Sequence, residues 1–165
     1  MKTTSLISSL SLIVAIGFCF AQDSTTTGKV LFVSDKTDKP AKFFLDAFTE
    51  ELTASGRPFD EVAVDAKSPV DPAEYSSIVV YSQVMAFNNI SPVSAWVKSQ
   101  KSLQGKRLFL FVTANRWFYE SRLKKLVKLV GDRDGEVVDA VTMATTKMNA
   151  EQKRGLVRKM VKKMP

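Results

Sequence analysis

Apolar runs alternate with amphipathic segments along most of the chain. The runs typical of β-strands are Val30–Val33, Phe59–Val64, Ser77–Tyr81, Leu108–Val112 and a stretch around Val137–Val141. The first, third and fourth are almost continuously apolar, which indicates strands buried on both faces of a parallel sheet. The run Phe59–Val64 alternates apolar and polar residues instead, which indicates a less buried strand that pairs at an edge.

Segments with apolar residues at helical spacing lie between or after these runs. Pro40 suits the first turn of the first segment, because its missing N–H is not needed there. Ser91-Pro92 pairs a capping serine with a proline, and Asn149 with Gln152 has the reciprocal pattern of a capping box. The predicted helices occupy residues 40–56, 91–105, 123–131 and 149–161.

This alternation of strands and helices predicts an α/β fold of the doubly wound type. Helices would cover both faces of a five-stranded parallel sheet, which gives a three-layer sandwich. Right-handed crossovers leave few arrangements of such a sheet. Roughly 140 residues follow the amino-terminal segment, enough for one compact domain over residues 29–165.

The amino terminus has the pattern of a secretory signal peptide. Met1-Lys2 gives a positive start, Leu6–Phe20 is almost wholly apolar or small, and Ala21 is a small residue at the expected cleavage point. The apolar run is shorter than the ~20 residues that span a bilayer, which favours a cleaved signal over an anchor. We therefore expect removal of residues 1–21, a polar linker over residues 22–28, and a secreted or periplasmic domain.

Composition excludes several kinds of chemistry. The chain has no histidine, and its single cysteine, Cys19, lies in the predicted signal peptide. Histidine-based catalysis, thiolate chemistry and metal sites built from either residue are therefore excluded in the mature domain. A hydrolase that used Ser34 or Ser82 would lack a histidine base. We predict no catalytic residue and no metal site.

The order and texture of the chain resemble the flavodoxin family over nearly all of the mature domain. Tyr75–Ser82 is similar to the family's third strand, Ser91–Val97 to its following helix, and Gly105–Phe111 to its "G-K-K-x-A-L-F" fourth strand. The resemblance implies a sheet in the order 2-1-3-4-5. It also implies flavin mononucleotide bound beyond the carboxyl ends of the strands, beside the first and third.

In flavodoxins the loop after the first strand wraps the flavin phosphate with hydroxyls and backbone N–H groups. The matching loop here, Ser34–Pro40, has the right length and keeps Ser34 and Thr37. The resemblance therefore makes both residues candidate phosphate ligands.

The same loop departs from the family pattern at two positions. Asp38 stands in the usual place of a glycine and Pro40 in that of the last threonine, so an N–H donor and a hydroxyl are lost. Asp35 and Asp38 would repel a phosphate dianion unless Lys36 and Lys39 offset their charge. Each lost hydrogen bond weakens binding by about 1–3 kcal/mol, so we predict a site that has lost the family's phosphate chemistry.

Two later loops match the family's ring-binding loops. The resemblance implies Phe87 against one face of the isoalloxazine ring and Trp117 or Tyr119 against the other. Arg116 beside them could meet the phosphate. Alternatively, Trp117 caps the core beneath the next helix. The candidate residues of the two loops are Phe87, Asn88, Asn115, Arg116, Trp117 and Tyr119.

The segment from Arg116 to Leu126 is loosely similar to the "R-W-(F/Y)-x-x-x-L-x-K-L" segment of small quinone-linked and protoporphyrinogen-oxidising members of the family. Together with the predicted signal peptide and the changed phosphate loop, the resemblance leads us to expect a secreted protein that binds flavin mononucleotide weakly. Such a protein would pass electrons to a redox partner.

Charge leaves a second function open. Thirteen basic and six acidic residues follow from Arg116 onward, so the whole net charge of +7 lies in the last third. A basic surface attracts anionic partners, here a redox protein, an anionic envelope component or a membrane surface, with no specific nucleic acid expected. The same residues could instead form the solvated faces of two amphipathic helices. The alternative to a flavoprotein is thus a flavin-free binding module whose association weakens with salt.

Overall fold

The computed structural model describes residues 28–35, 39–84, 91–114 and 119–165. Within them, five strands form one sheet: β1 (Val30–Ser34), β2 (Phe59–Ala63), β3 (Ser77–Val84), β4 (Arg107–Ala114) and β5 (Glu136–Ala144). All neighbouring strands pair in parallel, in the order β2-β1-β3-β4-β5. The predicted order 2-1-3-4-5, with the second strand at an edge, is confirmed.

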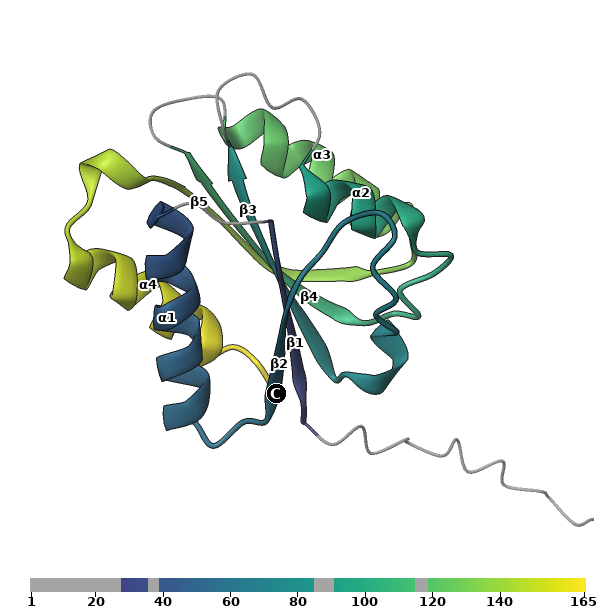
Figure 1. Ribbon diagram of the computed structural model, residues 1–165, viewed down its shortest axis with the longest axis horizontal. Helices are drawn as coiled ribbons and strands as arrows, with labels where there is room; N and C mark the ends of the chain where they lie inside the picture. Colours follow the sequence, from purple (N-terminus) through teal and green to yellow (C-terminus); the bar gives the residue numbers. More distant parts are fainter. Residues whose placement is uncertain (1–27, 36–38, 85–90, 115–118) are drawn as a thin grey trace, which may run out of the picture.

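Helices cover both faces of this sheet. Those among the described residues are α1 (Lys39–Ala54), α2 (Pro92–Ser99), α3 (Tyr119–Gly131) and α4 (Ala150–Val161), with short 3₁₀ turns η1 (Pro72–Glu74) and η2 (Thr145–Lys147). Figure 1 shows α1 and α4 side by side on one face and α2 and α3 on the other. The three-layer α/β architecture is therefore as predicted.

The layer under α1 and α4 is rich in aromatic residues. Phe32 of β1 lies against Phe48 of α1, with ring centroids 4.9 Å apart. Phe44 of α1 lies 5.2 Å from Phe111 of β4 and 5.7 Å from Tyr81 of β3. Rings at these separations add to the free energy of burial, so this cluster fixes α1 across the centre of the sheet.

The layer under α2 and α3 is mainly aliphatic. Trp96 of α2 is fully buried against strand residues such as Ile78 and Leu110. Every residue of β1 is buried, alternately in one layer and the other. The continuous apolar run Val30–Val33 is thus explained by a central strand with no solvent-facing side.

Two element boundaries differ from the sequence prediction. β3 continues through Val84, so Ser82 and Gln83 are strand residues rather than loop residues. α2 ends at Ser99, and Leu103 reaches the core from a turn after the helix. The Leu103 N–H donates to the Arg133 carbonyl at 2.6 Å, which holds this turn against the segment before β5.

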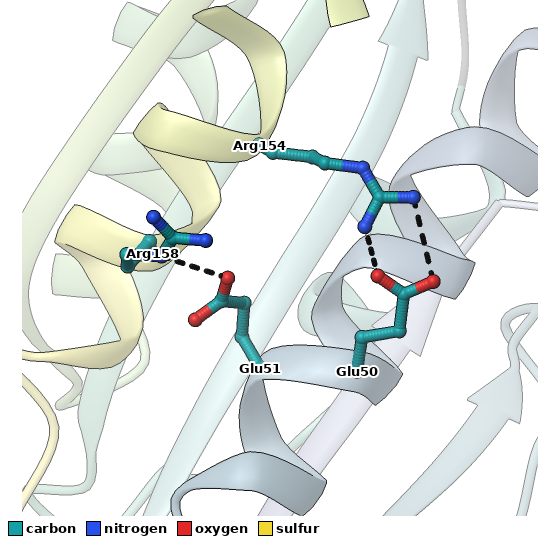
Figure 2. Close-up of polar contacts among 4 residues, drawn as sticks. All are labelled: Glu50, Glu51, Arg154 and Arg158. Atoms are coloured by element: carbon teal, nitrogen blue, oxygen red, sulfur yellow. Dashed lines mark hydrogen bonds and ion pairs between the residues drawn. The ribbon is translucent and has the colours of Figure 1, made fainter. Parts of the chain in front are cut away.

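Polar contacts join the two helices of the aromatic layer. Arg154 of α4 pairs with Glu50 of α1, and the Nε atom of Arg158 lies 2.9 Å from a carboxylate oxygen of Glu51 (Figure 2). Arg57, in the turn after α1, donates to the backbone carbonyls that end α4: Val161 at 3.3 Å, Met164 at 2.9 Å and Pro165 at 2.9 Å.

The predicted signal peptide and most of the linker, residues 1–27, lie outside the described part of the chain. Within the described residues, no helix has both the length and the apolar character needed to cross a membrane.

Candidate functional site

Buried polar side chains gather at the end of the sheet where its parallel strands terminate, here called the carboxyl end. Of seven such residues in the described part of the chain, only Ser77 lies at the opposite, amino end. Burying a polar group costs free energy unless it is hydrogen-bonded, so this concentration at one end needs a reason. The six residues at the carboxyl end are Ser34, Asp35, Ser82, Gln83, Ser91 and Thr113.

Asp35, the first residue after β1, is the centre of this group. Its Oδ2 atom accepts the Ser82 hydroxyl at 2.9 Å and the Gln83 backbone N–H at 3.1 Å. Its Oδ1 atom accepts the Ser91 hydroxyl at 3.0 Å and the Val93 backbone N–H at 2.9 Å. One oxygen therefore binds the end of β3, and the other binds the start of α2.

The N-terminus of α2 is filled by the protein's own side chains. Ser91 caps the helix by accepting the Ser94 N–H at 3.1 Å, and Asp35 takes the Val93 N–H. A negative charge at a helix N-terminus is stabilised by the helix dipole, as a bound phosphate would be. The Asp35 carboxylate thus occupies the helix N-terminus as a bound anion would, and hydroxyls and backbone N–H groups donate to it.

The carboxylate of Asp35 belongs to the α2 side of the sheet. Residues of β1 alternate between the two layers, so Leu31, Val33 and Asp35 share the α2 side, whereas Ser34 shares the α1 side with Phe32. We expected Asp35 to repel a phosphate at the start of α1. The structure instead turns its charge toward α2 and satisfies it there.

Two features describe the α1 side of the carboxyl end. The Tyr81 hydroxyl lies 2.9 Å from the Thr113 hydroxyl, which bridges β3 and β4. The helix begins at Lys39, with Pro40 as its second residue, so the prediction of a first-turn proline is confirmed. Proline carries no N–H, so the N-terminus of α1 has one donor fewer for an anion.

Known protein structures share the fold of this chain. No protein-family model matches the chain, and no curated protein matches its sequence. The flavodoxin of Streptococcus pneumoniae TIGR4 has a TM-score of 0.67 at 12% identity, covering 82% of this chain and 97% of that chain. The fold is flavodoxin-like. Flavodoxin 2 from Bacillus cereus scores 0.61 at 12% identity, covering 81% and 97%. The flavodoxin of Megasphaera elsdenii scores 0.59 at 15% identity, covering 80% and 98%.

In a flavodoxin-like sheet the strand order changes direction between β1 and β3, and ligands bind beyond the carboxyl ends at this point. Asp35, Ser82 and Gln83 lie beside it. Low identity to the solved flavodoxins shows the fold alone, so the site must be judged on its own residues. The hydroxyl and amide groups of Ser34, Gln83 and Thr113 suit the polar edge of an isoalloxazine ring. The proline in α1 suits a phosphate less well.

Most of the predicted ligand residues lie outside the described residues. Ser34 is described and is buried at the end of β1. Lys39 and Tyr119 are the first residues of α1 and α3, but their side chains are not described. The strands that precede the three candidate loops, β1, β3 and β4, are neighbours in the sheet. The predicted residues outside the described part are Lys36, Thr37, Phe87, Asn88, Asn115, Arg116 and Trp117.

Sequence reasoning missed the polar group around Asp35. The sequence indicates Asp35 only as a source of repulsion, and the apolar run of the third strand ends at Tyr81, one residue before Ser82. The serine cap before Pro92 was the one local sign of it, because a cap marks where a helix N-terminus needs acceptors. No group of three or more His, Cys, Asp or Glu able to hold a metal ion occurs in the described ranges.

The basic residues of the last third do not form one surface. α3 packs in the aliphatic layer and α4 in the aromatic layer, on opposite sides of the sheet. Several bases have partners in the described structure: Lys128 with Asp132, Lys163 with Asp139, and the two arginines of α4 with α1. Exposed lysines outside these ion pairs are Lys124 and Lys125 on α3, and Lys159 and Lys162 at the end of α4.

Proposed function

We propose that this chain is an extracytoplasmic electron-transfer protein that binds flavin mononucleotide weakly at the carboxyl end of its sheet. A bound flavin would supply the redox chemistry, and the protein would bind and orient it. The proposal includes removal of residues 1–21 and a redox partner outside the cytoplasm.

The observation that carries the proposal is the position of the buried polar group. Six of the seven buried polar residues in the described structure lie at the carboxyl end of the sheet, which is the ligand-binding end of this fold. Hydroxyl and amide groups gathered there lie beside the place where a ligand of this fold would bind. The polar group is therefore consistent with a ligand that carries its own hydrogen-bonding groups.

Different predicted ligand residues would bind the phosphate and the ring of the flavin. Ser34, Thr37, Lys36 and Lys39 would hold what phosphate binding remains after the changes at Asp38 and Pro40. The aromatic residues of the two later loops would stack on the ring, because base-like rings bind well between aromatic faces. Weak phosphate binding and good ring binding together predict an affinity that depends more on the ring than on the phosphate.

The test uses the chain from Gln22 onward, purified from a secreting host without added flavin. We expect a flavin absorption spectrum, or quenching of flavin fluorescence with a dissociation constant in the micromolar range or tighter. Absence of a spectrum and of quenching at high flavin concentration would retire the proposal.

The second candidate is a flavin-free module for an anionic partner. The exposed Lys124 and Lys125 on one side, and Lys159 and Lys162 on the other, support it. Binding to vesicles of phosphatidylglycerol that falls steeply with salt, by a chain that binds no flavin, would favour this function.

A further inference from the structure

Asp35 connects three chain segments that border the carboxyl end. It follows β1 directly, and its backbone N–H donates to the Tyr81 carbonyl of β3 at 3.3 Å. Its carboxylate then binds the end of β3 through Ser82 and Gln83, and the start of α2 through Ser91 and Val93. One side chain therefore holds the end of β3 and the start of α2 to the end of β1.

Only a carboxylate suits this place among residues of its size. An ionised carboxylate accepts hydrogen bonds through both oxygens and donates none. Four donors bind the Asp35 carboxylate in the described structure, two backbone N–H groups and two hydroxyls. An asparagine would direct an NH₂ group at one of these pairs and lose at least the bond from that pair's backbone N–H, because a hydroxyl can turn to accept but an N–H cannot.

We infer that Asp35 is a positioning residue for flavin binding. Its carboxylate fixes the end of β3 and the start of α2 to the end of β1, and this sets the geometry of the carboxyl end where the ring binds. The inference rests on the proposed function. It assigns Asp35 no direct contact with the flavin.

A purely electrostatic role for Asp35 makes the opposite prediction for flavin mononucleotide. If Asp35 acted mainly by its charge, it would weaken the binding of flavin mononucleotide, which carries a phosphate, and not of riboflavin, which carries none. If Asp35 positions the site, its loss weakens both ligands by the same factor. The ratio of the two dissociation constants therefore separates the roles.

The experiment measures the dissociation constants of riboflavin and flavin mononucleotide by fluorescence quenching. The variants are Asp35→Asn, and Ser82→Ala as a milder change that keeps the charge. The matched control is Tyr75→Phe, which removes a partly buried hydrogen bond to the Asp60 carboxylate at the amino end of the sheet. Each variant is measured where circular dichroism shows it folded, and hydrogen exchange reports the Gln83 and Val93 amides.

We expect Asp35→Asn to raise both dissociation constants by about tenfold or more, since hydrogen bonds to a charged group are lost. Ser82→Ala should raise both by a smaller, equal factor, with faster exchange at Gln83. The control should change neither constant. If Asp35→Asn does not fold, Ser82→Ala alone decides, and unchanged constants in that variant overturn the inference.

Three results would overturn it directly. Tighter binding of flavin mononucleotide alone in Asp35→Asn would show a charge effect. Unchanged binding of both ligands would show that the hydrogen bonds serve the fold only. If the unaltered chain bound neither flavin, the proposed function and this inference would fail together, whereas the first two results leave the proposed function standing.

Discussion

The Oδ1 atom of Asp35 accepts the backbone N–H of Val93 at 2.9 Å, so the residue that follows the first strand caps a helix 58 positions later in the chain. Contacts this distant in sequence close long loops, which costs chain entropy that the folded state must offset. The four hydrogen bonds to the buried Asp35 carboxylate contribute to offsetting this entropy cost.

Replacing Asp35 by alanine should leave four donors without their acceptor. We expect Asp35→Ala to lower the free energy of unfolding by about 3 kcal/mol, because buried groups that lose a charged partner are left desolvated and unpaired. Urea denaturation followed by circular dichroism measures the loss.

The same variant should respond to small carboxylates. Formate or acetate can occupy the space of the missing side chain and accept the same hydrogen bonds, so either should raise the melting temperature of Asp35→Ala but not of the unaltered chain. Chloride at equal ionic strength is the control. An equal response to chloride would mean that the space does not act as an anion site.

Gly135 lies where no side chain fits. A Cβ atom there would stand 2.7 Å from Cγ1 of Val130 and 2.9 Å from Cδ1 of both Leu103 and Leu108. We expect Gly135→Ala to destabilise the fold by about 1–3 kcal/mol through overpacking. The matched control is Gly155→Ala inside α4, where nothing lies within 4 Å of the added atom. That change should stabilise the helix by up to about 1 kcal/mol, and a loss of stability there would contradict this explanation.

Tyr75 should make the fold sensitive to alkali. Burial, followed by the hydrogen bond to Asp60, raises the pKa of Tyr75 from 10.0 to about 12. Above the ordinary pKa the unfolded chain loses this proton while the folded chain keeps it, so stability falls as the pH rises from about 10 to about 12. Urea midpoints at about pH 9 and pH 11 should differ more for the unaltered chain than for Tyr75→Phe. Equal shifts would sink the prediction.

Asp60, which accepts the hydrogen bond of Tyr75, should make stability depend on pH in acid. Hydrogen bonds from Lys29 and then Tyr75 lower the pKa of the Asp60 carboxyl below its ordinary value of 3.8. This stabilisation is present above about pH 4 and is lost as the pH falls through the lowered pKa. Asp60→Asn should therefore flatten the acid limb of the stability curve, which an acid titration of the urea midpoint can measure. If stability falls as steeply with acid in Asp60→Asn as in the unaltered chain, other carboxyl groups dominate the acid response.

Arg57 and Arg158 should differ in their effect on stability. The guanidinium of Arg57 donates to three backbone carbonyls at the end of α4, whereas Arg158 makes one exposed ion pair with Glu51. We expect Arg57→Met to cost about 1–2 kcal/mol and Arg158→Met less than about 1 kcal/mol. High salt should reduce only the loss of stability caused by Arg158→Met, because salt screens exposed ion pairs. A larger loss for Arg158→Met than for Arg57→Met would contradict the view that Arg57 holds the end of α4.

Local pattern was enough to predict the strands, whereas their order followed from the resemblance to flavodoxins. β1 is apolar throughout and buried throughout, and β2 alternates and lies at an edge. The end of α2 was not predictable in this way. Leu103 continues the helical spacing of Trp96, yet it enters the same core from a turn held by the Arg133 carbonyl. That partner lies 30 positions away, beyond any local window.

The candidate site was less predictable than the fold, for a related reason. Polar residues that follow an apolar run normally indicate the end of a strand, so the pattern predicts that the third strand ends at Tyr81, before Ser82 and Gln83. They remain in β3 because Asp35 supplies a buried acceptor for both. Sequence separation of 47 and 48 positions hides this pairing, and the carboxylate alone suggested only repulsion.

The separation of the two lysine pairs has a consequence for stoichiometry. Lys124 and Lys125 lie on the helix layer opposite to the one that carries Lys159 and Lys162. An acidic molecule held by one pair would leave the other pair open to solvent. Such a molecule would then saturate the protein at two copies per chain. One domain would also be able to bind two large anionic surfaces at once, one through each lysine pair.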